Sequence, residues 1–110
     1  MLIGVPKEIK VRESRVGLVP NSVAELLGRG HSVLVETRAG AGIGASDDAY
    51  RAAGAEIAAS AADVFAKAEV IVKVKEPQPN EWVQLSADQI LFTYLHLAAD
   101  MAQTLSLIHI

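Results

Sequence analysis

The stretch EVIVKVKEP, Glu69–Pro77, is the part of the sequence that decides the fold class. Its run of β-branched apolar residues predicts a buried strand, and Pro77 ends the strand because proline has no N–H to give to a sheet. The segment SAADVFAKA before it predicts a short helix capped by Ser60, and AEIAA predicts a strand before that helix. This strand–helix–strand order indicates a βαβ unit with parallel strands.

The same alternation continues in both directions along the chain. We expect the α/β class, with a three-layer Rossmann-like or flavodoxin-like, mostly parallel sheet flanked by helices, in a truncated form. The remaining predicted elements are a strand at Leu2–Val5 stopped by Pro6, a helix capped by Asn21, a strand at His31–Thr37, a helix capped by Ser46 and stopped by Gly54, a helix or turn in NEWVQLSAD, a strand in QILFTYLH and a helix start in DMAQTL.

Composition excludes several classes of function. The chain has 110 residues, of which 51% are hydrophobic and 21% charged, and its net charge of −3 gives no basic field for nucleic acid. It has no cysteine, so disulfides and thiolate metal sites are excluded. The start MLIGVPKEIK is not a signal peptide, and no apolar run is long enough to span a bilayer. We therefore expect a cytoplasmic protein with no membrane partner.

Charged side chains follow three of the predicted strands. In an open parallel sheet, ligands bind outside the carboxyl ends of the strands, so these side chains are the candidate site. Arginine gives a carboxylate a two-point fork, lysine gives it a point charge, and histidine moves protons near neutral pH. The residues are Lys7, Lys10, Arg12 and Arg15 after the first strand, Lys73 and Lys75 at the end of the fourth, and Tyr94 and His96 at the end of the fifth.

Each of these residues also has an ordinary structural interpretation. Basic loop residues and a strand-end lysine are usually solvated, and His96 is compatible with a core histidine that has a hydrogen-bond partner. The convergence of three segments on one edge favours a site for a small carboxylate. No nucleophile triad and no metal cluster is visible in the sequence.

The glycine-rich loop RAGAGIGAS suggests a second interpretation. From Gly40 it satisfies G-x-G-x-x-A after a strand, with Asp63 downstream, which is a dinucleotide-binding pattern. Such a motif must open a helix whose N-terminus faces the pyrophosphate. Here the capped helix begins only at Ser46, and Asp47 and Asp48 would repel phosphates, so we expect a turn without cofactor-binding residues.

Several segments together resemble the N-terminal part of the bacterial alanine dehydrogenase family. They are IGVPKEIKVRESRVGLVP, ELLGRGHSVLVETRAGAGIGASDDAYRAAGAEI, VIVKVKEP and ILFTYLHLAAD, in matching order and spacing. The resemblance implies an NAD-dependent enzyme that interconverts L-alanine with pyruvate and ammonium, usually as a homohexamer. It implies that Arg15 clamps the substrate carboxylate, Lys75 contacts the substrate oxygens, His96 is the general acid/base, and Tyr94 lines the same pocket.

The resemblance also divides the chain. Residues 1–104 correspond to the first part of the substrate domain, and the Rossmann domain that binds NAD is absent, so the fragment itself should be inactive. The last six residues, LSLIHI (105–110), resemble the translation of a sequencing-library adapter, and we expect a non-native tail; the alternative is a genuine C-terminal strand.

Two other functions stay open at this point. One is the N-terminal domain of the NAD(P) transhydrogenase α-subunit, a relative whose version of TYLHLAAD typically lacks the histidine. The other is a stand-alone binding module for small carboxylates, which would need only Arg15 and Lys75.

Overall fold

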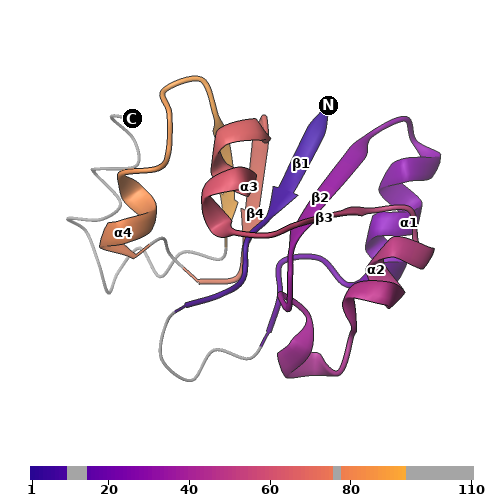
Figure 1. The fold of residues 1–110 in the computed structure, drawn as a ribbon. Coiled ribbons are helices and arrows are strands. Elements are labelled where there is room, and N and C mark those ends of the chain that lie inside the picture. The colour runs from indigo at the N-terminus through magenta and orange to yellow at the C-terminus, as the bar shows by residue number, and fades with distance from the viewer. Residues whose placement is uncertain (10–14, 76–77, 94–110) are drawn as a thin grey trace.

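The computed structural model describes residues 1–9, 15–75 and 78–93. Strands and helices alternate through this part of the chain (Figure 1), as the sequence predicted, and none of the helices there is long and apolar enough to cross a membrane. The elements are β1 (Leu2–Val5), α1 (Pro20–Gly28), β2 (Ser32–Glu36), the 3₁₀ turn η1 (Ala41–Ile43), α2 (Asp47–Ala52), β3 (Glu56–Ala58), α3 (Ala61–Lys67), β4 (Val70–Lys73), α4 (Pro79–Trp82) and β5 (Ile90–Thr93).

The five strands form one sheet in the order β3-β2-β1-β4-β5, and every pair is parallel. The central strand β1 contacts β2 and β4, so that Ile3 pairs with Val33 on one side and with Val70 on the other. The chain builds outward from β1 in one direction, then crosses back and builds outward in the other. The strand order therefore reverses between β1 and β4, and the carboxyl ends of these two strands are where ligands bind in open α/β sheets.

Helices cover both faces of the sheet and create two cores (Figure 1). On one face, Val23 of α1 and Tyr50 of α2 pack against Val5 and Val35. On the other face, Phe65 of α3 and its neighbours pack against inward-facing residues of β2 and β4. Strand alternation explains this division, because successive side chains of a strand point to opposite faces. The three-layer α/β prediction is confirmed.

Local sequence signals located several helix ends correctly. Ser46 accepts a hydrogen bond from the Ala49 amide at 3.1 Å, and Ser60 accepts one from the Asp63 amide at 3.3 Å, so both are N-caps as predicted. The Asn21 cap is wrong, because the N-cap of α1 is Val19, two residues earlier. Pro20 takes the first helical position, where its fixed φ suits the helix and its missing N–H costs nothing.

The fourth strand is shorter than the sequence pattern suggested. β4 ends at Lys73, so Lys75 lies beyond the strand, and β5 is described as far as Thr93. Tyr94, His96, the predicted helix in DMAQTL and the tail at 105–110 lie outside the described residues.

Candidate substrate-binding edge

Arg15 lies at the predicted edge of the sheet, beside two hollows. One, of about 350 Å³, is lined by Lys7 and Glu8 from the loop after β1 and by Arg38 and its neighbours after β2. The other, of about 300 Å³, is lined by Arg15 together with Val74, the residue that follows β4. The Arg15 side chain is exposed and borders both. The fold therefore brings Arg15 close to the end of β4, one residue from Lys75.

Lys75 has a fixed backbone and an available side chain. Its amide donates a hydrogen bond to Oε1 of Glu8 at 3.1 Å, and its carbonyl accepts one from the Thr93 hydroxyl at 3.1 Å. The residue is half-buried, and no other described residue forms an ion pair or hydrogen bond with its ammonium group. Lys75 can therefore offer its charge to a ligand while its main chain is held from both sides.

Lys73, which the sequence placed beside Lys75 as a second candidate cation, is not available to a ligand. Its side chain is only 1% exposed, and its Nζ lies 3.2 Å from Oε1 of Glu8 and 3.0 Å from Oε2 of Glu81. A buried ammonium needs such partners because desolvation of an unpaired charge is costly. The two lysines thus have different environments although they are only two residues apart.

Glu8 is the residue of this edge that sequence reasoning missed. Its carboxylate accepts three hydrogen bonds, from the Lys73 ammonium and the Lys75 amide at Oε1 and from the Val74 amide at Oε2. The signal in the sequence was weak, because Glu8 is one of two glutamates in a loop that also carries several basic residues. A contact across 65 to 67 positions leaves no periodicity to detect.

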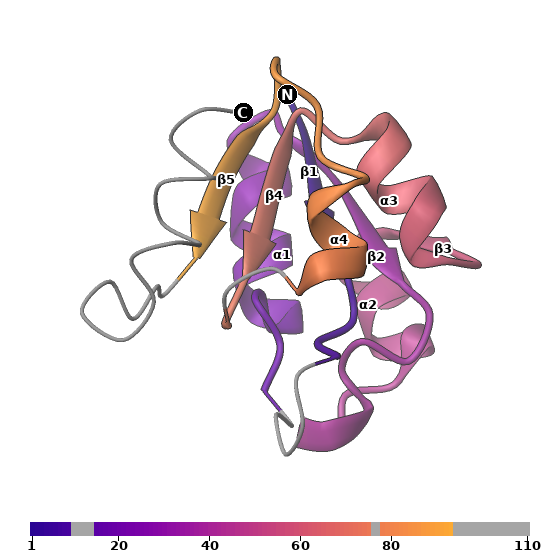
Figure 2. The ribbon, with the colours of Figure 1, turned by 90° about the vertical axis from the view of Figure 1, so that its left-hand side faces the viewer.

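The remaining predicted site residues, Tyr94 and His96, lie outside the described residues. The strand that leads to them, β5, pairs with β4 in parallel register, with Thr93 opposite Lys73. The described structure therefore ends at the same edge of the sheet as Lys75 and Arg15, and Figure 2 shows β4 and β5 running side by side to that edge.

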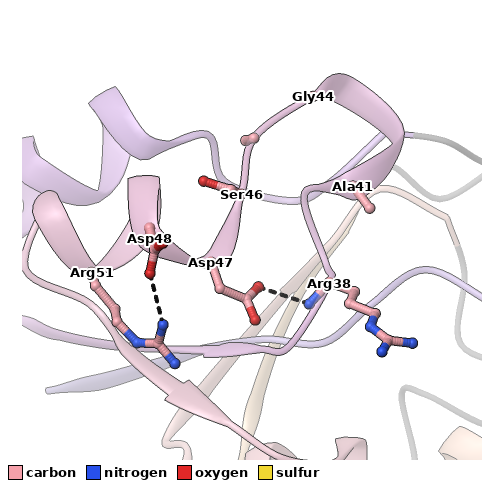
Figure 3. A pocket seen from close by; sticks show the side chains of 8 residues that line it. Arg38, Ala41, Gly44, Ser46, Asp47, Asp48 and Arg51 are labelled. Carbon is pink, nitrogen blue, oxygen red and sulfur yellow. Dashed lines mark hydrogen bonds and ion pairs between the residues drawn. The ribbon is translucent and has the colours of Figure 1, made fainter.

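The glycine-rich loop forms a separate hollow of about 510 Å³ at the start of α2 (Figure 3). The Asp47 carboxylate there accepts hydrogen bonds from the Thr37 hydroxyl at 2.6 Å and from the Arg38 amide at 2.9 Å, and these bonds lower the pKa of Asp47. Arg38 has φ of 65°, an uncommon value for a residue with a side chain, and the Asp47 contact holds it there. Asp48 pairs with Arg51 at 3.0 Å.

A dinucleotide does not fit this loop. A Cβ atom at Gly40 would lie 2.6 Å from the Tyr50 ring and 2.7 Å from the Ala45 carbonyl oxygen, so this glycine serves internal packing rather than the approach of a phosphate. The helix that follows has two aspartates in its first turn, which oppose an anion. Among the residues that the structure describes, no group of histidine and carboxylate side chains could hold a metal ion.

The all-parallel sheet, with Lys7, Arg15 and Arg38 beside the hollow at the strand-order reversal, defines an open α/β domain. Residues 4–109 match the family described as "Alanine dehydrogenase/PNT, N-terminal domain". The chain belongs to this family.

Curated relatives and solved structures agree with that assignment. The chain is 54% identical over 108 residues to an alanine dehydrogenase of Halomonas elongata, covering 98% of this chain and 29% of that protein. It is 54% identical over 107 residues to an alanine dehydrogenase of Bacillus subtilis, covering 96% of this chain and 28% of that protein. The chain therefore spans less than a third of the length of these relatives.

Two solved structures share the fold. An L-alanine dehydrogenase superposes with a TM-score of 0.93 at 52% identity, covering 99% of this chain and 30% of that one. A transhydrogenase from Sinorhizobium meliloti superposes with a TM-score of 0.89 at 28% identity, covering 96% of this chain and 31% of that one. The transhydrogenase is the more distant of the two in sequence.

Proposed function

We propose that this chain is the N-terminal part of the substrate domain of an alanine dehydrogenase, which interconverts L-alanine with pyruvate and ammonium. The observation that carries the proposal is the 54% identity to an alanine dehydrogenase over 98% of the chain. The identity to the transhydrogenase structure is 28%, which disfavours that alternative although the fold is shared.

Three residues of this chain would act on the substrate. The guanidinium of Arg15 would bind the carboxylate through two parallel hydrogen bonds, and the Lys75 ammonium would contact the carboxylate or ketone oxygen. His96 would move protons while ammonia adds to the ketone and water leaves, and Tyr94 would line the pocket. Positioning of the reactants by such groups supplies much of the rate of reactions of this kind.

The rest of the reaction would depend on parts of the protein beyond this chain. A nicotinamide cofactor, held outside the described residues, would supply the hydride, so that pyruvate, ammonium, NADH and a proton give L-alanine, NAD⁺ and water. The glycine loop of this chain is a poor match for that cofactor because of its packing and its aspartates. The family resemblance further leads us to propose a homohexamer in the cytoplasm.

The test is steady-state kinetics on the full-length protein that carries this chain. His96→Ala should lower kcat by roughly two to four orders of magnitude, the usual contribution of a general acid/base. Arg15→Lys should chiefly raise KM for pyruvate, because it keeps the charge and loses the two-point fork. Lys75→Ala should impair both KM and kcat.

The matched control is Arg29→Lys, the same exchange at an exposed arginine of the α1 C-cap whose partner is Glu25 at 3.3 Å. It should leave both constants unchanged, and the dissociation constant of NADH should be the same in all variants. Near-normal turnover of His96→Ala would remove the histidine from the mechanism. Hydride exchange between nicotinamide nucleotides without turnover of alanine would favour the transhydrogenase alternative.

A further inference from the structure

The three charged side chains that the described structure buries most deeply form a single cluster. Glu8, Lys73 and Glu81 are 6%, 1% and 2% exposed, and no other charged residue in the described ranges is classed as buried. Two carboxylates share the Lys73 ammonium, at 3.2 and 3.0 Å. We call Glu8, Lys73 and Glu81 the buried triad. Burying charges costs more than a surface pair returns, so a triad at this edge needs a reason beyond stability.

The buried triad replaces main-chain pairing at the end of β4. The register between β1 and β4 ends at Gly4 and Ile71, and Pro6 then gives no N–H for further pairing. The amides of Val74 and Lys75 donate to the two carboxylate oxygens of Glu8 instead, each at 3.1 Å. Glu8 therefore continues the connection between the two central strands beyond the sheet itself.

Lys73 contacts Glu8 directly, whereas the Glu81 carboxylate, among the described residues, contacts only the Lys73 ammonium and the start of α4. Lys73 donates to the same Oε1 atom that receives the Lys75 amide, and it joins Glu8 to Glu81. Glu81 is in turn fixed to the start of α4, because its Oε1 accepts the Gln78 amide at 2.9 Å. Figure 2 shows α4 beside the end of β4. The triad thus joins the loop after β1, the end of β4 and α4.

On the opposite side, the main chain at Lys75 is held by β5. The Thr93 hydroxyl donates to the carbonyls of Val74 at 3.4 Å and Lys75 at 3.1 Å. The peptide that carries Lys75 is therefore fixed between the loop that leads to Arg15 and the strand that leads to His96. We propose that Glu8 is a positioning residue that sets the Lys75 ammonium relative to the substrate.

This role rests on the proposed function, because it assigns Lys75 to the substrate. It acts through geometry alone, since Glu8 holds the main chain and Lys75 provides the contact. A displacement of about 1 Å at a reacting group is enough to cost roughly 100-fold in rate. Loss of the two amide contacts should therefore affect the reaction even where the domain stays folded.

The experiment compares two chemically identical changes in the full-length protein. Glu8→Gln and Glu81→Gln each replace a buried carboxylate that contacts Lys73, but only Glu8 binds the amides of Val74 and Lys75. Glu8→Gln should lower kcat/KM for pyruvate about 10- to 100-fold, while Glu81→Gln should change it by less than about threefold. The dissociation constant of NADH should be unchanged in both.

A second variant keeps the test decisive if Glu8→Gln does not fold. Glu8→Asp keeps the negative charge beside Lys73, but the shorter side chain cannot reach both amides, so kcat/KM should still fall about 10-fold or more. Equal losses for the changes at Glu8 and Glu81, or a loss that follows the folded fraction in every variant, would show that the triad is merely structural.

Amide hydrogen exchange separates this proposal from the proposed function. Glu8→Gln should speed exchange at Val74 and Lys75 relative to the wild-type protein, and Glu81→Gln should leave these two amides protected. This result does not require turnover. If the wild-type protein fails to oxidise alanine but Glu8→Gln speeds exchange of the two amides, the proposed function is wrong, whereas the role of Glu8 in fixing the main chain at Lys75 is confirmed. Unchanged exchange in Glu8→Gln overturns the positioning role.

Discussion

Replacement of Lys73 by methionine should destabilise the domain strongly, because it removes the one ammonium that two buried carboxylates share. Methionine retains a side chain of similar length, so the change mainly removes charge and hydrogen bonds. Removal of one partner from a buried ion pair typically costs about 3–5 kcal/mol. Glu8 would keep two amide donors and Glu81 one, so we expect the lower part of that range, about 3–4 kcal/mol.

The measurement is native-state hydrogen exchange on the full-length protein, followed in peptides that cover β4. A loss of about 3–4 kcal/mol corresponds to roughly 140- to 720-fold faster exchange of amides that open with the domain, since each 1.4 kcal/mol is a factor of ten. Lys67→Met is the matched control, because Lys67 is an exposed lysine in the last turn of α3. Lys67→Met should change the free energy of opening, as obtained from exchange, by less than about 0.5 kcal/mol.

A compensating variant tests the physical cause. If the cost arises from unpaired buried carboxylates, Glu8→Gln and Glu81→Gln added to Lys73→Met should restore most of the lost stability. A Lys73→Met protein that exchanges no faster than Lys67→Met would refute the reasoning, and so would a triple variant that is less stable than Lys73→Met alone.

Three further changes probe packing and titration in the described domain. Tyr50→Phe removes the hydroxyl that donates to the Leu18 carbonyl at 2.7 Å and should cost about 1 kcal/mol in denaturant unfolding. Burial raises the pKa of Tyr50 from 10.0 to about 12. The contribution of the neutral phenol to the free energy of unfolding is therefore complete below pH 10 and is lost as the pH rises toward 12. The phenylalanine variant should lose less stability over that interval. The Thr37 and Arg38 hydrogen bonds lower the pKa of Asp47 below 3.8. The contribution of the Asp47 carboxylate to the free energy of unfolding is therefore present above pH 4 and is lost as the pH falls through the lowered pKa. Asp47→Asn should make the free energy of unfolding depend less on pH at the acid end. Gly4→Ala should cost about 1–3 kcal/mol in thermal unfolding, because the new methyl group would lie 2.6 Å from a side-chain atom at the C-cap of α3, and an unchanged melting temperature would contradict the close approach.

The sequence was most informative where structure depends on neighbouring residues. Ser46 and Ser60 are N-caps because a hydroxyl and an amide three residues later meet by local geometry alone. The predicted Asn21 cap was wrong for an equally local reason, because the helix already begins at Pro20. The alternation of apolar strands and capped helices was sufficient to predict the parallel sheet.

The site was only partly predictable. Arg15 and Lys75 follow strands, and the rule about carboxyl ends makes them candidates without any knowledge of contacts. The difference between Lys73 and Lys75 was not predictable in this way, because it depends on Glu8 and Glu81, which come from other elements. Buried ion pairs between distant segments have no sequence period, so Lys73 and Lys75 looked equivalent in the sequence. In the fold, Lys73 is buried in ion pairs, whereas the Lys75 ammonium can contact a ligand.

The central position of β1 has a consequence for synthesis of the protein on the ribosome. One edge of β1 pairs with β2 soon after both emerge, but its other edge waits for β4, since Gly4 pairs with Ile71. At about 5–20 residues per second, the 67 residues between them take roughly 3–13 s to translate.

During that interval, the Glu8 carboxylate remains hydrated, because both Lys73 and Glu81 are made after β3 is complete. In the nascent β1–β2–β3 sheet, the edge of β1 that later pairs with β4 is therefore still open, and a charged carboxylate lies in the loop just after that strand. Charge beside an open edge discourages pairing with other chains. The residue that we assign to positioning Lys75 in the finished domain would thus protect its unfinished form from aggregation.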